Sequence, residues 1–341
     1  MKAVVLGGGI AGVFTAYFLR ERGFEVVGVG GEVAYPLASL VLTLSMPYKE
    51  DVELAKRSLE IYRQFVELKE VTSVDILPRW ADLSRLAVPH QLADKVEGLR
   101  LGPDEVAVIT KDYLVPVRKV VKRLRKELGF LDSYGLLRVE DGRAYVVADG
   151  RRVDGDFVVL AAGHRNRALA EAAGLAVPLQ PYECYAAVFV TGRKTWRYSI
   201  GDYVLGWYGR PLAPPLYIAG DGCGRYGQGP PPGYLSRMTS LLSRRVGAVI
   251  PLYLKTGYCE VGPAGGPVYG RHPHVENLYV VGGLNGYGSM VGPALAERLA
   301  YLIAGGGVED GFRIEKYKQT AFDPCAVQER HDWGAALLRN V

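Results

Sequence analysis

The sequence lacks several patterns that define common classes of protein. It has four cysteines in 341 residues, and no two of them form a C-x-x-C pair, so neither a zinc knuckle nor a thioredoxin-type site is indicated. No apolar run is long enough to span a membrane, and no signal peptide precedes the first apolar strand. We therefore expect a cytoplasmic protein without a metal site.

A strong excess of charge of one sign is also absent, since the formal net charge is only +5. Lysine and arginine are dispersed except over 118–126, where they alternate with Val and Leu as on the solvent face of an amphipathic helix. We therefore expect no nucleic-acid partner. Methionine, asparagine and glutamine are scarce, which indicates a thermophilic source, and a hydrophobic fraction of 49% predicts a folded core.

The first informative feature is a glycine turn at the start of the chain. An apolar strand, Lys2–Leu6, leads directly into Gly7-x-Gly9-x-x-Gly12 and then into an apolar helix over 10–22, before a second strand over 24–29. Gly7 permits the tight turn, Gly9 lets a pyrophosphate approach the backbone, and Gly12 lets the helix pack closely on the strand. The free N–H groups of the helix would receive the phosphates, so the turn predicts a dinucleotide site.

Two further segments of this kind lie far along the chain. The apolar strand 156–163 ends in Ala161-Ala162-Gly163, and a strand beginning at Asn277 runs into the glycine-rich loop 282–293, followed by a helix over 294–303. An NAD enzyme needs only one such turn, whereas separate segments that meet on one cofactor favour FAD. The first turn would then hold the pyrophosphate and the last loop the isoalloxazine ring, with a helix N-terminus stabilising reduced flavin.

The regions between these segments predict a second type of architecture. Strands over 136–140 and 143–148 flank an Asp-Gly turn, which is a hairpin signal. The segment 180–254 is rich in Tyr, Pro and Gly, and we expect antiparallel strands joined by long loops that form a substrate-binding sheet. Helical periodicity covers 52–68 and 115–128.

With these motifs, the chain resembles the glutathione-reductase-type flavoproteins of the D-amino-acid oxidase, glycine oxidase and sarcosine oxidase group over almost its whole length. A shorter stretch, 206–211, also resembles archaeal dye-linked proline dehydrogenases. The segments that carry the group resemblance are Val4–Gly12, Val158–Gly163, Val177–Tyr182, Gly270–Pro273, Asn277–Tyr279 and Gly283–Gly288.

The resemblance implies an α/β (α+β) two-domain protein, in which a glutathione-reductase-type, Rossmann-like FAD-binding domain joins an antiparallel-sheet substrate domain. We expect the FAD domain to comprise 1–80, 111–178 and 263–341, and the substrate domain 81–110 and 179–262. It also implies an FAD-dependent oxidoreductase that oxidises a C–N bond of an amine or amino acid, proline-like or N-methylated, by hydride transfer to flavin N5.

The cofactor residues follow from the matched motifs and from the segment after the second strand. Those expected to bind FAD are Gly7, Gly8, Gly9, Ile10, Ala11, Gly12, Glu32, Ala38, Ser39, Ala161, Ala162, Gly163, Gly283, Leu284, Asn285, Gly286, Tyr287, Gly288, Ser289 and Met290.

The chain lacks charged residues that the group usually has at its ribose and substrate-carboxylate positions. Gly30 stands where an acidic residue usually binds the adenosine ribose, and Glu32 follows two residues later. The group's substrate-carboxylate cations align with apolar or small residues, at 40–44, 261–263 and Met290. Because a buried carboxylate needs a cation or several donors, Arg210 and Arg225 become the candidates for this role. Tyr208 and Tyr287 are the candidates for orienting the substrate.

The electron acceptor is predicted from a missing lysine. Sarcosine oxidases use a lysine above the flavin for reaction with oxygen, and the aligned stretch 216–220 has none, which favours a dehydrogenase that reduces a dye, quinone or partner protein. An oxidase of the same group, and a flavoprotein subunit or scaffold active only with partners, stay open as alternatives. The oligomeric state, including a homo- or hetero-oligomer, also stays open. Cys259 lies near the covalent flavin attachment site of sarcosine oxidases, although a free cysteine is more often a small buried hydrophobe.

Overall fold

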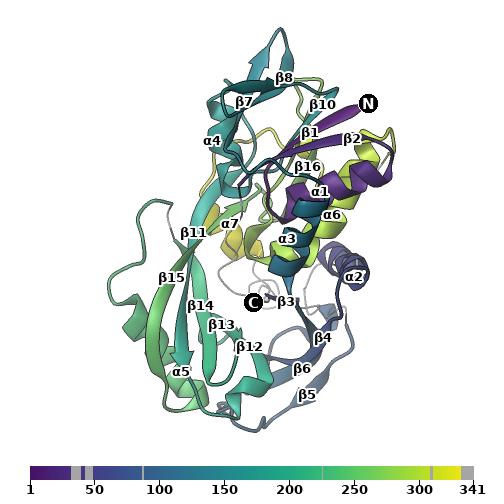
Figure 1. Cartoon of the computed structure of the whole chain (residues 1–341). Helices are drawn as coiled ribbons and strands as arrows, with labels where there is room; N and C mark the ends of the chain where they lie inside the picture. Colours follow the sequence, from purple (N-terminus) through teal and green to yellow (C-terminus); the bar gives the residue numbers. More distant parts are fainter. Residues whose placement is uncertain (32–39, 43–48, 87, 225, 308–309, 332–341) are drawn as a thin grey trace.

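The computed structural model describes residues 1–31, 40–42, 49–86, 88–224, 226–307 and 310–331, and Figure 1 shows their arrangement in two sheet-based layers. The first is a five-stranded sheet in the order β16-β17-β10-β1-β2, whose last four strands pair in parallel. The strands are β1 (Lys2–Leu6), β2 (Glu25–Val29), β10 (Phe157–Leu160), β16 (Val268–Arg271) and β17 (Leu278–Gly282).

This parallel sheet is covered on both faces, as its nearly continuous apolar strands require. One face packs against helices α1 (Ile10–Glu21), α2 (Lys49–Arg63), α3 (Val117–Glu127) and α6 (Gly288–Ile303). The other packs against α4 (Asn166–Glu171) and a small sheet of β7 (Gly135–Glu140), β8 (Arg143–Ala148) and β9 (Arg151–Val153). The predicted hairpin is confirmed in β7 and β8, with positive φ at Asp141 and Gly142.

The second layer is the large, mainly antiparallel sheet at the bottom of Figure 1, in the order β15-β11-β14-β13-β12-β4-β6-β3. Only the β12–β4 pair is parallel among its described pairings, and β5 adds to β6. The strands are β3 (Leu40–Leu42), β4 (Lys69–Pro78), β5 (Gln91–Ala93), β6 (Glu105–Val115), β11 (Gln180–Val190), β12 (Tyr198–Asp202), β13 (Trp207–Pro211), β14 (Leu216–Gly224) and β15 (Ile250–Val261).

The segment 180–254 was predicted as strands and loops alone, and this is wrong at one place, because α5 (Tyr234–Val246) lies within it. Tyr234, Met238 and Leu242 recur every four residues and are all buried against the large sheet. The prediction was made from the composition of the whole segment, in which a helical repeat of this short length does not stand out. A further short helix, α7 (Pro324–His331), follows near the end of the described chain.

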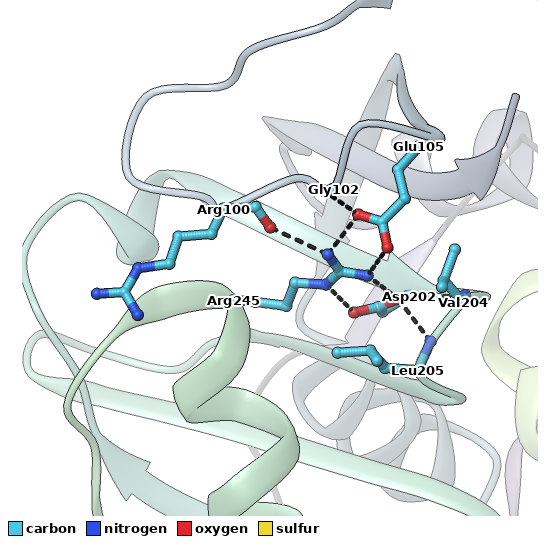
Figure 2. Close-up of polar contacts among 7 residues, drawn as sticks. All are labelled: Arg100, Gly102, Glu105, Asp202, Val204, Leu205 and Arg245. Carbon is cyan, nitrogen blue, oxygen red and sulfur yellow. Dashed lines mark hydrogen bonds and ion pairs between the residues drawn. The ribbon is translucent and has the colours of Figure 1, made fainter.

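A buried charge cluster fastens α5 to the large sheet (Figure 2). The Arg245 guanidinium donates to both carboxylate oxygens of Glu105, at 2.5 and 2.9 Å, and to both of Asp202, at 2.6 and 3.1 Å. Its Nη1 also reaches the Arg100 carbonyl at 3.0 Å. Two bidentate pairs satisfy the buried cation, and this geometry fixes the orientation of α5 across β12 and β6.

The last helix of the parallel layer also begins earlier than predicted. α6 starts at Gly288 rather than at Ala294 and includes Pro293. Proline cannot donate to the carbonyl four residues before it, which belongs to Ser289. That carbonyl instead accepts the Tyr62 hydroxyl of α2 at 2.9 Å, so a neighbouring helix satisfies it. Among the described helices, none is both long and apolar enough to cross a membrane.

Candidate functional site

The glycine turn after β1 leaves no room for side chains. Gly7 has φ +136°, and a Cβ on it would lie 2.1 Å from the Ala161 carbonyl oxygen. A Cβ on Gly12 would lie 2.0 Å from the Gly7 carbonyl oxygen. The N-terminus of α1 opens directly onto this turn at Ile10. A bare backbone turn in front of a helix N-terminus is the cradle that a dinucleotide pyrophosphate requires.

The three predicted cofactor segments leave the same edge of the parallel sheet. In the parallel pairing, Leu6 of β1 lies beside Leu160 of β10, and Leu160 lies beside Val280 of β17. The turn at Gly7, the segment from Ala161 and the loop from Gly283 therefore emerge together. Ligands of open α/β sheets bind at this carboxyl edge. The segments meet in space, while the contact of each residue with FAD stays a prediction.

The end of β2 explains the missing acidic residue. A Cβ on Gly30 would lie 2.4 Å from the Gly8 backbone nitrogen, so the glycine turn itself excludes a side chain there. Among the described residues, a carboxylate from another segment comes close, since Asp132 Oδ1 lies 3.7 Å from where a Cβ of Gly31 would be. Leu131, the residue before Asp132, forms a parallel β-bridge with Val29 at the end of β2. Glu32, Ala38, Ser39 and Arg225 lie outside the described residues.

Arg125 on α3 is a cation at this turn that the sequence did not predict. Its Nη1 donates to the Gly31 carbonyl at 2.9 Å and approaches the Gly8 carbonyl at 3.4 Å, and Nη2 lies 3.4 Å from Asp132. Its side chain is 11% exposed. Assigning all the basic residues of 118–126 to a solvent-exposed face was therefore wrong for Arg125. The guanidinium places positive charge beside the phosphate cradle.

A buried acid, Glu260, connects the loop after β17 to the large sheet and to α4. Glu260, near the end of β15, is 3% exposed, and its Oε2 accepts from the Gly283 N–H at 2.9 Å and the Asn166 amide at 3.0 Å. The Asn166 side chain also accepts the Ala162 N–H at 2.6 Å and donates to the Val281 carbonyl. One Glu–Asn pair thus fixes two of the predicted cofactor segments.

Burial raises the pKa of Glu260 to about 8, since no cation offsets the loss of water and only the Gly283 and Asn166 N–H groups oppose the shift. Its second oxygen, Oε1, is buried and has no hydrogen-bond partner among the described residues. Sequence reasoning missed Glu260 and Asn166. A charged residue next to the buried end of a strand was the available signal.

The segment 282–293, predicted to hold the isoalloxazine ring and called the flavin loop below, is held from two sides. The Tyr182 hydroxyl of β11 donates to Asn285 Oδ1, and the Asn285 amide donates to the Gly265 carbonyl at 3.2 Å. Asn285 adopts a left-handed backbone, with φ 51°. Ser289 and Met290 are buried, while Tyr287 is half-buried against the core of the parallel layer. The large sheet therefore positions the loop directly.

Replacing Tyr182 with phenylalanine is expected to weaken FAD binding by about 3- to 10-fold, because one hydrogen bond worth roughly 0.5–1.5 kcal/mol is lost while the ring still packs. The measurement is FAD affinity by quenching of flavin fluorescence. Tyr301→Phe, at a 48% exposed position on α6, is the matched control and should bind FAD normally. An unchanged affinity in Tyr182→Phe would show that the hydroxyl does not position the loop.

Arg210 is a buried cation on β13. The residue is 9% exposed, and burial lowers its pKa to about 10, so the guanidinium remains charged at neutral pH. Nη1 donates to the Pro211 carbonyl at 3.2 Å, whereas Nη2 is buried without a hydrogen-bond partner among the described residues. Burying a guanidinium with an N–H group that has no hydrogen-bond acceptor lowers the stability of the protein, unless a bound ligand supplies the acceptor.

Strand alternation places Arg210 on a defined face of the large sheet. Trp207 packs into the core under α5, so Tyr208 and Arg210 project from the opposite face. In register, Arg210 lies opposite Ile218, which lies opposite Val188 of β11. Tyr182 projects from the same face of β11 as Val188, and Tyr182 contacts the flavin loop. Arg210 and Tyr208 therefore lie on the face that meets the cofactor segments.

Tyr208 is 54% exposed, yet the protein around it raises the pKa of its hydroxyl through lost hydration and the neighbouring Cys184 and Cys259. Its hydroxyl is thus neutral at neutral pH and available as a donor. Within the described ranges, no group of three or more His, Cys, Asp or Glu residues could hold a metal ion.

Comparisons with known proteins agree with this geometry. The family model of DAO, described as FAD dependent oxidoreductase, matches residues 2–302. No curated protein sequence matches the chain at a significant level. Among solved structures, the L-proline dehydrogenase from P. horikoshii matches with a TM-score of 0.77 and 22% identity, covering 90% of this chain and 94% of that one.

Two further structures show the same architecture. The iminodiacetate oxidase from Chelativorans sp. BNC1 has a TM-score of 0.74 and 19% identity, covering 91% of this chain and 97% of that one. The glycine oxidase from Geobacillus kaustophilus has a TM-score of 0.73 and 16% identity, covering 100% of this chain and 98% of that one. At these identities the structures show a shared fold, and the predicted FAD-binding Rossmann-like layer with a largely antiparallel second sheet is confirmed.

Proposed function

Because the chain belongs to the DAO family of FAD-dependent oxidoreductases, we propose that it oxidises a C–N bond of an amino acid or amine, with proline-like or N-methyl amino acids favoured. We further propose that the electrons pass to an acceptor other than oxygen. When bound, FAD would supply the redox chemistry by accepting a hydride at flavin N5. The protein's part is to bind, orient and desolvate the substrate.

The residues at the carboxyl edge of the parallel sheet fit FAD, because Gly7, Gly12 and Gly30 have no room for a Cβ against neighbouring backbone, so the turn offers bare main chain to a pyrophosphate. The α1 N-terminus and Arg125 would hold the pyrophosphate. Asp132, beside Gly31, would accept the adenosine ribose hydroxyls in the role that Gly30 cannot fill. The α6 N-terminus would lie at the isoalloxazine end and favour negative charge there.

The observation that carries the substrate class is Arg210. A substrate carboxylate would accept from the open Nη2, and the buried site would strengthen this charge-assisted bond. Tyr208, on the same face, would add a hydroxyl donor. A neutral amine leaves the Arg210 donor unsatisfied, so the geometry favours amino acids over simple amines.

The proposal is tested by anaerobic reduction of the flavin. Purified protein loaded with FAD is mixed with proline, N-methyl amino acids and simple amines, and bleaching of the flavin absorbance is recorded without oxygen. We expect fast bleaching by a cyclic or N-methyl amino acid, and reoxidation by a dye or quinone faster than by air.

Three other results would each change the proposal. Steady oxygen uptake with peroxide formation would identify an oxidase. Flavin that no amine bleaches, together with a co-purifying second chain, would identify a partner-dependent flavoprotein subunit. Protein that gains no flavin absorbance after FAD addition would contradict the cofactor assignment itself.

A further inference from the structure

Cys184 and Cys259 form a close thiol pair on the large sheet. They lie on the adjacent antiparallel strands β11 and β15, and their sulfur atoms are 3.2 Å apart. A disulfide bond is about 2.05 Å long, so the sulfurs need to approach by only about an ångström. No sequence motif predicted this pair, because the two cysteines are 75 positions apart.

A glycine makes the contact geometrically available. In the sheet register, Cys184 lies opposite Gly257, and Cys259 lies opposite Tyr182. A Cβ on Gly257 would lie 2.9 Å from the Cys184 sulfur. Without that Cβ, the Cys184 side chain crosses over the partner strand and reaches the cysteine two residues further along it.

The two thiols differ in acidity, as an attacking and a resolving cysteine would. The hydrogen bond from Cys259 lowers the pKa of Cys184, while the same contact and burial raise the pKa of Cys259 well above its ordinary value. Both cysteines are partly exposed. This partial exposure gives a small oxidant access to the pair.

The pair lies against the element that positions the flavin loop. Tyr182, whose hydroxyl bonds to Asn285, packs in one cluster with both cysteines and with Val327 of α7. Cys325, also on α7, is disulfide-bonded, so this part of the fold already contains an oxidised cysteine. A second cross-link here would tie β11 to β15 next to the Tyr182 side chain.

We propose that Cys184 and Cys259 are a peroxide-reactive dithiol that closes to a disulfide next to Tyr182. The Cys184 thiolate attacks one peroxide oxygen, the O–O bond breaks, and a sulfenic acid and water are formed. The Cys259 sulfur then attacks the Cys184 sulfur, the S–O bond breaks, and the hydroxyl leaves as a second water. Two thiols lose two electrons, and one peroxide is reduced to two waters.

The test is peptide mapping of the FAD-loaded protein by mass spectrometry, before and after treatment with hydrogen peroxide. We expect a Cys184–Cys259 cross-linked peptide, lighter by two hydrogens than the two free peptides, and the loss of two reactive thiols, both reversed by dithiothreitol. The cross-link is expected whether or not any amine reduces the flavin, so its failure is distinct from failure of the proposed reaction.

Three variants sharpen the experiment. Cys259→Ser should stop at the sulfenic acid on Cys184, which dimedone traps, while Cys184→Ser should lose at least 10-fold in its rate of reaction with peroxide. Gly257→Ala should slow the cross-link while both thiols remain present. The proposal is overturned if folded wild-type protein retains both thiols in excess peroxide, if Cys184 proceeds to sulfinic acid without cross-linking, or if Cys259 is found bonded to flavin.

Discussion

Replacing Arg210 with methionine is expected to lower kcat/KM for an amino-acid substrate by about 100- to 1000-fold, which corresponds to roughly 3–4 kcal/mol of lost binding to the transition state. The reason is the buried guanidinium, whose Nη2 has no hydrogen-bond partner in the described part of the chain. A substrate carboxylate would accept a hydrogen bond from this Nη2 in a site from which water is largely excluded. Steady-state kinetics with a dye acceptor make the measurement.

Arg210→Lys separates charge from geometry. Lysine retains the cation but not the planar donor pair, so we expect an intermediate loss carried mostly by KM. Arg197→Met is the matched control, because Arg197 lies in the short turn just before β12, its side chain is 63% exposed and it pairs with Glu97 at 3.1 Å. It should change kcat/KM by less than about 2-fold, as expected for an exposed ion pair.

A comparison of substrate classes distinguishes a carboxylate clamp from a merely structural arginine. If Arg210 binds the carboxylate, Arg210→Met loses activity toward amino acids while its slow reaction with carboxylate-free amines is retained. If Arg210 only supports the sheet, both activities fall together and the melting temperature falls with them. The second pattern would remove the assignment of Arg210 and the preference for amino acids.

The cofactor segments could be predicted because their constraints are local. Gly12 is required by its contact with the Gly7 carbonyl inside one strand–turn–helix unit, and Gly7 by the positive φ of the turn itself. Such local constraints leave a fixed spacing in the sequence. The parallel strands β10 and β17 could be predicted from the sequence for a similar reason, because strands that are buried on both faces consist almost entirely of apolar residues. The predicted meeting of three distant segments followed from these two local signals.

The residues that join the layers could not be predicted in this way. Arg125 belongs to an amphipathic helix with many cations, and only the approach of α3 to the glycine turn distinguishes it. Glu260 is one glutamate among many until β15 brings it beneath Gly283. The cysteine pair depends on a strand register between segments far apart in the sequence. These contacts are set by tertiary packing, which leaves no periodic pattern in the sequence.

Glu260 gives the second large prediction, a stability that falls as pH rises. The folded-state pKa of about 8 exceeds the ordinary value of 4.5, so the folded protein retains a proton that the unfolded chain releases. The contribution of Glu260 to stability is therefore fully present below about pH 4.5 and is lost progressively as pH rises to about 8. Each pH unit in this window costs about 1.4 kcal/mol, and the whole window roughly 4–5 kcal/mol.

Glu260→Gln should remove this dependence while the contacts remain. The glutamine carbonyl can accept from the Gly283 N–H and the Asn166 amide, and its NH₂ group takes the place of the protonated oxygen. We expect the variant and wild type to have similar free energies of unfolding at pH 5, and the variant to be more stable by several kcal/mol at pH 9. Denaturant titrations at each pH give the difference between the two proteins, in which the other titrating groups cancel.

Two comparisons decide whether the buried acid itself causes the effect. Glu21→Gln, at an exposed position on α1, should give a difference that does not change with pH. Glu260→Leu should be less stable than wild type at pH 5, because the Gly283 N–H and the Asn166 amide lose their acceptor. A difference between Glu260→Gln and wild type that stays flat from pH 5 to 9 would mean that Glu260 does not hold its proton. The flavin loop would then be held by an ionised carboxylate, and a compensating cation would have to lie against Glu260 Oε1.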